Sequence, residues 1–302
     1  MKTLVVALGG NALLQRGEAL TVENQYRNID SAVPALAKLA RRYRLAIVHG
    51  NGPQVGLLAL QNQALDADAP WPLDVLVAES QGMIGYMLAQ RLAKEPDMPP
   101  ITTVLTRIEV AQNDPAFDAP EKFIGPVYPP EQQRELEASR GWQMKRDGKY
   151  LRRVVASPIP KRIEESSAIE LLLKEGHLVI CSGGGGVPVT ECGQGAEAVI
   201  DKDLAAALLA EQIDADGLII LTDADAVYEH WGTPQQRAIR QATPAELAPF
   251  AKADGSMGPK VAAVSGYVER KGKPAWIGAL TRIEETLAGE AGTCIRAQSS
   301  AR

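Results

Sequence analysis

Two lysines stand in this sequence where they could grip a phosphoryl group. Lys202 lies between Asp201 and Asp203 at the start of a helical run, where the helix dipole favours the carboxylates. A lysine held by two carboxylates stays charged and keeps a fixed direction. Lys260 follows a glycine-containing run and stands in the first turn of another expected helix, where we expect a bound anion to offset the unfavourable dipole. Taken alone, the Asp-Lys-Asp run is better explained by a helix cap inside a solvated charge cluster.

Three apolar runs end in glycine-rich turns, which is typical of ligand loops at the ends of buried parallel strands. The runs are residues 4–8, 45–48 and 178–181, and the turns are residues 9–11, 50–54 and 183–186. Four consecutive glycines at 183–186 are hard to explain by packing, because each lowers stability by roughly 0.5–1 kcal/mol relative to alanine. We expect the amides of Asn51 and Gln54 to donate hydrogen bonds to a small carboxylate-like ligand.

Strands alternate with helices along the chain, which predicts an open, mostly parallel α/β sheet with ligands at the carboxyl ends of its strands. Further strands are expected at 101–105, 218–221 and 275–277, and helices at 21–42, from 80, at 163–174, after 203, after the Thr243–Glu246 capping box and from 259. Pro34 predicts a kink or break near residue 33. Residues 112–153 are rich in proline and charge and predict an inserted flap.

Several polar residues leave two interpretations open. His49, at a strand end, is a candidate base, and a packed, hydrogen-bonded histidine is at least as good an interpretation. Asp223 and Asp225 are candidate metal ligands, although caps or turns explain them better. Lys122 is a lone charge in the flap, and its spacing gives it no special role.

Composition limits the function classes. The chain has 302 residues and a net charge of −5 without a basic block, which argues against nucleic acid and acidic membranes as partners. No run approaches the ~20 apolar residues of a membrane span, and the amino-terminal run is too short for a signal peptide. Three cysteines without a CxxC pair suggest a reducing compartment, and hence the cytoplasm.

Familiar catalytic motifs are missing from the sequence. It contains no GxxxxGK[ST], no HExxH, no GxSxG and no kinase-type catalytic loop. This excludes the P-loop enzymes and the common hydrolase types. The glycine loops and the two lysines still point to a phosphorylated ligand.

Eight motifs, in order from residue 4 to about 293, carry a family resemblance. They are ALGGNA (7–12), HGNGPQVG (49–56), QGMIGY (81–86), DPAF (114–117), RRVV (152–155), GGGGVPV (183–189), EAVIDKDLA (197–205) and GSMGPKV (255–261). With these motifs the chain resembles the carbamate kinases of the amino-acid kinase superfamily.

The resemblance implies an αβα sandwich of one domain over 1–302, with a substrate lobe (1–212, including the flap at about 112–153) and a nucleotide lobe (213–302). It also implies a homodimer and reversible transfer from ATP to carbamate, giving ADP and carbamoyl phosphate, with Mg²⁺ bound mainly through the nucleotide phosphates. The expected direction is ATP synthesis in catabolism.

The resemblance also assigns roles to residues, by their positions in the motifs. Lys202 and Lys260 would stabilise phosphoryl oxygens, Asp203 would orient these lysines, and Lys122 would reach in from the flap. Gly9, Gly10, Asn11, Gly183 and Gly184 would bind the phosphoryl group or substrate, and Gly50, Asn51 and Gly52 would position carbamate. Thr222, Asp223, Val227, Tyr228, Met257 and Gly258 would bind the nucleotide.

The flap departs from the family pattern. Residues 120–125 read PEKFIG where the family usually has PTKPIG, and residues 147–153 read DGKYLRR where the family tends to have GRGYRR. The acceptor therefore has alternatives: another small acid in place of carbamate, or a nucleotide-binding sensor without turnover.

Overall fold

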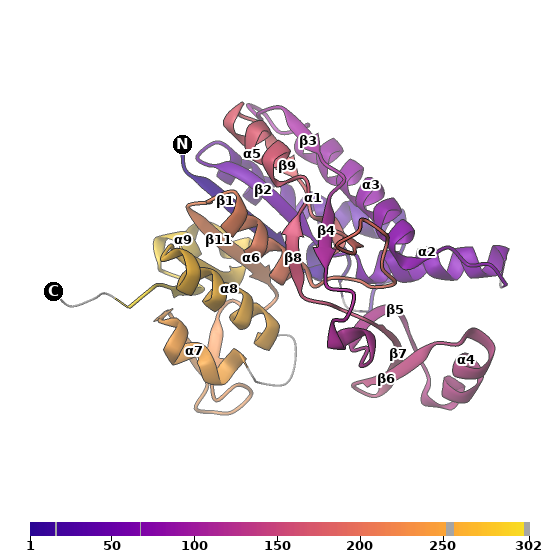
Figure 1. Ribbon diagram of the computed structural model, residues 1–302. Helices are drawn as coiled ribbons and strands as arrows, with labels where there is room; N and C mark the ends of the chain where they lie inside the picture. Colours follow the sequence, from indigo (N-terminus) through magenta and orange to yellow (C-terminus); the bar gives the residue numbers. More distant parts are fainter. Residues whose placement is uncertain (16, 67, 252–256, 299–302) are drawn as a thin grey trace.

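The computed structural model describes residues 1–15, 17–66, 68–251 and 257–298. Its centre is a twisted sheet with the strand order β14-β16-β15-β11-β1-β2-β9-β3, shown in Figure 1 between two layers of helices. Neighbouring strands run parallel except for the β15–β16 pair. The strands are β1 (Thr3–Leu8), β2 (Arg44–His49), β3 (Ile101–Thr103), β9 (Leu178–Ile180), β11 (Gly217–Thr222), β14 (Gln241–Ala242), β15 (Ala275–Ala279) and β16 (Thr293–Ile295).

Helices cover both faces of this sheet, which confirms the predicted α/β sandwich. In β1, Val5 and Ala7 face a core shared with α5, α6, α7 and α8, while Leu4, Val6 and Leu8 face a core shared with α1, α3 and α9. Burial on both faces explains why the central strands read as unbroken apolar runs. The helices are α1 (Val22–Ala40), α2 (Gly52–Leu65), α3 (Leu73–Leu92), α5 (Ser166–Lys174), α6 (Lys202–Gln212), α7 (Pro244–Ala251), α8 (Met257–Lys271) and α9 (Ile283–Ala288).

The predicted flap forms a small unit of its own beside the main sheet (Figure 1). It holds the sheet β5-β7-β6 and one helix, and its small core consists of Leu136, Trp142, Met144 and Leu151. Its elements are β5 (Lys122–Tyr128), α4 (Gln133–Arg140), β6 (Gln143–Asp147) and β7 (Tyr150–Val155). Together they span residues 122–155, close to the predicted segment 112–153.

Short elements connect these larger units. A second sheet contains β4 (Arg107–Val110), β8 (Pro160–Ile163) and β10 (Val187–Val189), and a hairpin pairs β12 (Val227–Glu229) with β13 (Arg237–Ile239). The 3₁₀ turns are Gly10–Ala12, Pro115–Phe117, Pro130–Gln132, Gly183–Gly185 and Leu280–Arg282.

The break predicted at Pro34 is wrong. Helix α1 continues through Pro34, whose side chain is exposed, as is Asp30 one turn earlier. Proline removes the hydrogen bond to the carbonyl of Asp30. On an exposed face water can satisfy that carbonyl, so the helix survives.

The main sheet also crosses the predicted lobe boundary at 212/213. That boundary falls between α6 and β11, and β11 pairs with β1 of the other lobe. The division into lobes stays a prediction. No helix in the described residues is long and apolar enough to cross a membrane.

Candidate active site

The first two glycine loops leave the central sheet side by side. Leu8 of β1 pairs with His49 of β2, so Gly9 and Gly50 are the next residues on neighbouring strands. Neighbouring strands lie about 4.8 Å apart. A Cβ placed on Gly50 would lie 3.3 Å from Cδ of Lys202. The aliphatic part of the Lys202 side chain therefore lies against the loop at Gly50. The loop at Gly9 is one strand spacing away.

The end of β11 lies on the other side of Gly9. Ala7 pairs with Ile220, and this register brings Gly9 opposite Thr222. A Cβ on Gly9 would lie 2.6 Å from the carbonyl oxygen of Leu221. Only glycine permits this approach, so the predicted phosphoryl loop touches the first of the predicted nucleotide residues.

The remaining residues of the first two loops lie at the starts of helices. Gly10 and Asn11 belong to the 3₁₀ turn Gly10–Ala12, and the side chain of Asn11 lies outside the described part of the structure. Gly52 begins α2, and a Cβ there would lie 3.5 Å from the carbonyl oxygen of Phe123 in the flap. The second loop thus stands between the sheet and the flap.

One carboxylate joins the two predicted lysines. Nζ of Lys202 lies 2.6 Å from Oδ1 of Asp203, and Nζ of Lys260 lies 3.0 Å from Oδ2. The Asp203 side chain is 2% exposed, and the lysine side chains are 11% and 13% exposed. The group carries a net charge of +1 and is largely shielded from solvent, which favours binding of an anion. Asp203 also supplies the charge that we expected an anion to provide for Lys260.

The flap lysine has its own carboxylate partner. Lys122 Nζ donates to Oδ2 of Asp201 over 2.6 Å. The other oxygen of Asp201 caps α6 by accepting from the backbone N–H of Asp203 at 2.9 Å and of Leu204 at 3.4 Å. The structure therefore brings Lys122 next to the Lys202–Asp203–Lys260 group, across 79 residues of sequence.

The four-glycine loop is explained by packing, which corrects our argument from its sequence. Its residues are buried, and added Cβ atoms at Gly183 and Gly184 would lie 2.5 Å from Nε2 of His49 and 2.2 Å from Nδ2 of Asn51. Cβ atoms at Gly185 and Gly186 would meet Ile200 and Ile108. A role of Gly183 and Gly184 in substrate binding stays a prediction, and it would depend on their backbone groups.

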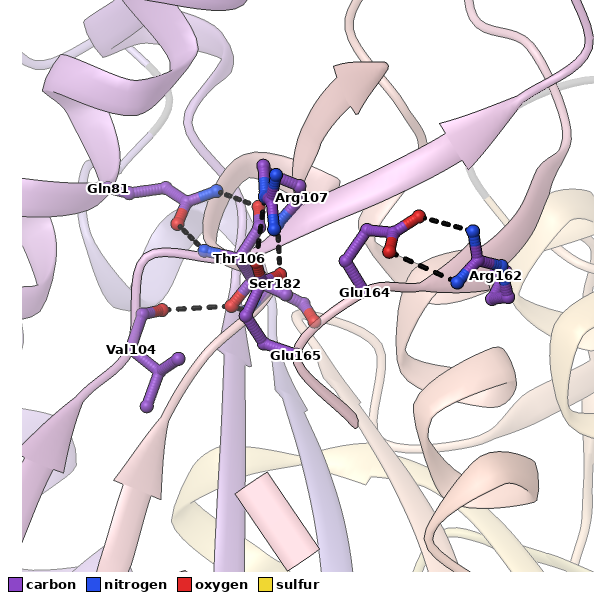
Figure 2. A network of polar contacts seen from close by, with 8 residues as sticks. All are labelled: Gln81, Val104, Thr106, Arg107, Arg162, Glu164, Glu165 and Ser182. Carbon is purple, nitrogen blue, oxygen red and sulfur yellow. Dashed lines mark hydrogen bonds and ion pairs between the residues drawn. The ribbon is translucent and has the colours of Figure 1, made fainter. Parts of the chain in front are cut away.

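A hydrogen-bonded network fixes the start of this loop (Figure 2). Gln81 of α3 holds both backbone groups of Thr106, and the Thr106 hydroxyl accepts from the N–H of Ser182 at 2.9 Å. Ser182 has a left-handed φ of 49°. Among the described residues its buried hydroxyl has no hydrogen-bond partner. Our sequence analysis did not single out Ser182, because its left-handed backbone is visible only in the structure.

The same network reaches the surface through two ion pairs. Figure 2 shows Arg107 next to Glu165 and Arg162 next to Glu164. Nε of Arg107 lies 2.8 Å from Glu165, and Arg162 lies 2.6 Å from Glu164. The Arg107–Glu165 pair ties the segment after β8 to the strand that follows Thr106, whereas the Arg162–Glu164 pair joins the end of β8 to the residue that follows it.

The side-chain amides of the second loop are used inside the protein, contrary to our expectation. Nδ2 of Asn51 donates to Oγ of Ser80 at 2.8 Å, and Nε2 of Gln54 donates to Oε1 of Gln25 at 3.0 Å. Asn51 and Gln54 are 2% and 1% exposed. Their amides therefore shape the loop rather than open onto a ligand.

His49 is a packed histidine. It is 1% exposed, and Nδ1 lies 2.9 Å from the carbonyl oxygen of Gly50. Burial lowers the pKa of His49 to about 4, against the opposing effect of that hydrogen bond. The ring is neutral at pH 7, so Nδ1 carries the proton that it donates to Gly50.

The predicted nucleotide residues lie near the end of β11, with one exception. Thr222 ends β11, Asp223 is exposed, and Met257 and Gly258 begin α8. Val227 is the exception because its side chain is 1% exposed in the hydrophobic core. Its N–H also donates to Oγ1 of Thr293 at 2.8 Å. The Val227 side chain is therefore not available to a nucleotide.

Tyr228 is held by its neighbours. Its hydroxyl donates to Asp225, which raises the pKa of Tyr228. Its ring lies 5.2 Å from that of Trp231, which is 68% exposed. Our sequence analysis did not single out Trp231, whose exposed side chain lies beside a predicted nucleotide residue only in the structure.

The carboxylate of Asp225 is held by an arginine and a tyrosine. Oδ2 of Asp225 lies 3.5 Å from Arg282, and its other oxygen accepts from Tyr228. The described part of the chain holds no group of three or more residues suited to bind a metal ion. Residues 255 and 256 of the motif before Lys260 lie outside the described residues.

Comparisons with known proteins agree with this fold. The family model described as "Amino acid kinase family" matches residues 2–279. The chain is 83% identical over 295 residues to carbamate kinase of Escherichia coli strain K12, covering 98% of this chain and 99% of that protein. A structure of carbamate kinase from Giardia lamblia bound to citric acid has 37% identity and a TM-score of 0.92, and covers 98% of this chain and 99% of that chain. A second one, bound to AMP-PNP, has 36% identity and a TM-score of 0.88, with the same coverage.

The chain therefore belongs to the amino acid kinase family. All strands of its main sheet except β16 lie within the residues that the family model matches, as do Lys202 and Lys260. Within that family it belongs to the carbamate kinases, because the identity of 83% extends over nearly the full length of both chains.

Proposed function

We propose that the protein transfers a phosphoryl group reversibly between ATP and carbamate, giving ADP and carbamoyl phosphate. The single observation that carries this proposal is the pairing of Lys202 and Lys260 with the two oxygens of Asp203. This group stands beside Gly50, one strand spacing from Gly9. The 83% identity to a carbamate kinase supports the choice of acceptor.

The chemistry needs no protein nucleophile. A carbamate oxygen attacks the γ-phosphorus, the bond from that phosphorus to the bridging oxygen of ADP breaks, and ADP leaves with that oxygen. Charge builds on the three equatorial phosphoryl oxygens. Lys202 and Lys260 neutralise this charge, and Asp203 keeps their ammonium groups in place before the substrate arrives.

The glycine loops supply backbone contacts to the same group. Gly9, Gly10 and Asn11 hold the transferred phosphoryl, while Gly50 to Gly52 position carbamate. Backbone N–H groups suit this role because they carry a fixed dipole and no charge of their own. The buried amide of Asn51 shapes its loop by donating to Ser80.

The nucleotide lies over the end of β11 and the start of α8. Thr222 and Asp223 follow that strand, and Met257 and Gly258 begin the helix that carries Lys260. Tyr228 borders the same region from β12. A Giardia lamblia carbamate kinase of the same fold has been solved with AMP-PNP, which supports nucleotide binding here.

Mg²⁺ is expected to enter with the nucleotide and to be bound by its phosphates. Asp201 and Asp203, the carboxylates beside the site, are already paired with lysines. Because these carboxylate oxygens already pair with lysines, they are poorly suited to act as metal ligands as well. When bound, the metal neutralises phosphate charge.

A coupled assay for ATP formed from ADP and carbamoyl phosphate tests the proposal. Turnover supports it, whereas nucleotide binding without turnover would identify a sensor. Turnover only with another small acid would identify a different kinase, an outcome worth testing because the flap motif at 120–125 departs from the family pattern. We expect turnover with carbamoyl phosphate.

Two further expectations come with the family. We propose a homodimer, to be checked by light scattering on the eluting protein. We also propose a cytoplasmic location, which is supported by the three free cysteines in the described residues. Fractionation of the producing cells would check it.

A further inference from the structure

Asp201 uses its two carboxylate oxygens for two different purposes. Oδ1 accepts from the backbone N–H of Asp203 and so caps α6. Oδ2 accepts from Nζ of Lys122 at 2.6 Å. Because α6 also carries Lys202 and Asp203, the cap fixes Asp201 relative to the proposed catalytic group.

The backbone brings the flap lysine to this carboxylate. Lys122 is paired with Val155 at the base of the flap, where β5 meets β7. The next residue, Ala156, accepts from the N–H of Val199 at 3.0 Å, two residues before Asp201. The base of the flap and the approach to α6 are therefore joined by hydrogen bonds.

The pair is suited to exchange partners with an anion. The side chains of Lys122 and Asp201 are 25% and 22% exposed, compared with 2% for Asp203. Burial alone would raise the pKa of the Asp201 carboxyl, but the charges of Lys122 and Lys202 lower this pKa well below its usual range. The Asp201 carboxylate is therefore charged at pH 7. An ion pair in contact with water is weaker than a buried one, so a phosphoryl anion can compete for the lysine.

We propose that Asp201 is a positioning residue for Lys122. Its Oδ2 holds the flap lysine beside the Lys202–Asp203–Lys260 group until the phosphorylated substrate takes over that ammonium, and its Oδ1 keeps this holder attached to α6. This inference rests on the proposed function, because it gives Lys122 a phosphoryl ligand. It goes further by assigning the orientation of Lys122 to a residue outside the flap.

Asp201→Asn separates the two purposes of the carboxylate. Asparagine caps helices about as well as aspartate, so α6 keeps its first turn while the charge that holds Lys122 is lost. We expect kcat/KM for carbamoyl phosphate to fall about tenfold, since small displacements of a charged group have effects of this size or larger. The KM for ADP and the Tm should stay near those of the wild type.

A double variant tests whether Asp201 acts through Lys122. A purely structural role of Asp201 would not produce the coupling in kcat/KM that we expect between these two residues. If Asp201 acts through Lys122, then Asp201→Asn/Lys122→Ala should be no more than about twofold worse than Lys122→Ala alone. Lys145→Ala is the matched control, because Lys145 forms an exposed pair with Glu121 in the same flap. It should leave kcat/KM unchanged.

Hydrogen exchange tests the inference without using activity. Asp201→Asn should speed amide exchange in β5 and leave the first turn of α6 unchanged. Additive losses in the double variant, wild-type kcat/KM in Asp201→Asn, or faster exchange in α6 with a lower Tm would each overturn the inference. If the wild type makes no ATP but β5 still loosens in the variant, the proposed function fails while the hold on Lys122 stands.

Discussion

The lysines of the site are held in two different ways. Lys202 and Lys260 come from α6 and α8, which pack on the main sheet through a large core. They share Asp203, which is 2% exposed. Lys122 comes from a flap whose own core has only four buried residues, and its partner Asp201 is 22% exposed.

This difference separates a fixed part of the site, whose ion pairs are buried, from a part whose ion pair is open to water. Moving either of two ammonium groups away from one buried carboxylate costs much free energy, because each such movement leaves a buried charge unpaired. A partly exposed pair on a small subdomain has no such penalty. We infer that Lys202 and Lys260, on the helices of the main sheet, supply charge that is in place before the substrate binds. Lys122, on the flap, supplies charge only when the substrate replaces Asp201 as its partner.

Lys202→Ala should produce the largest effect, because it removes charge from the fixed part. We expect turnover to fall at least ~100-fold, about 2.7 kcal/mol in the activation barrier, while the protein still folds. Steady-state kinetics with a circular dichroism spectrum would measure this. Near-normal turnover would show that the fixed part is not where the phosphoryl charge is stabilised.

Lys122→Ala should have a smaller and more selective effect. We expect turnover to fall about 30-fold, roughly 2 kcal/mol, with little change in ADP binding, because the flap contacts the acceptor side. Titration calorimetry with ADP, next to the kinetics, separates the two. Equal losses in turnover and in ADP affinity would contradict the different roles that we assign to Lys122 and to the Lys202–Asp203–Lys260 group.

His49 should make the stability of the fixed part depend on pH. Its pKa is lowered from 6.5 to about 4 in the folded protein, so the unfolded chain binds more protons between these values. The stability contributed by neutral His49 is complete above pH 6.5 and is lost as the pH falls toward 4, by up to about 1.4 kcal/mol per pH unit. Urea unfolding at pH 7, 6 and 5 should show this slope, and His49→Gln should lack it. Parallel slopes in both proteins would contradict a buried, neutral ring.

Lys145→Ala should have the smallest effect. Its pair with Glu121 spans 3.3 Å, with side chains 46% and 78% exposed. Such surface pairs contribute from 0 to about 1 kcal/mol, so we expect less than about 0.5 kcal/mol in the free energy of unfolding and unchanged kinetics. A clear loss of turnover would mean that the flap charges act together rather than through Lys122 alone.

The sequence by itself determined the strands of the main sheet other than β14 and β16, and the position of the fixed lysines at the starts of helices. Apolar runs such as residues 4–8 predict buried parallel strands because both faces of such strands are covered. Asp201 to Asp203 predicts the start of α6 because capping is a local interaction. The row of glycine loops follows from strands that end at one edge of a parallel sheet.

Only the tertiary structure decided which partners these residues have. Lys122 meets Asp201, and the glycines at 183–186 make room for His49, Asn51, Ile200 and Ile108. The side chain of Val227 lies in the hydrophobic core. The physical reason is the same in each case. Capping and periodicity act over a few residues, whereas these contacts join segments that only the packed sheet and flap bring together.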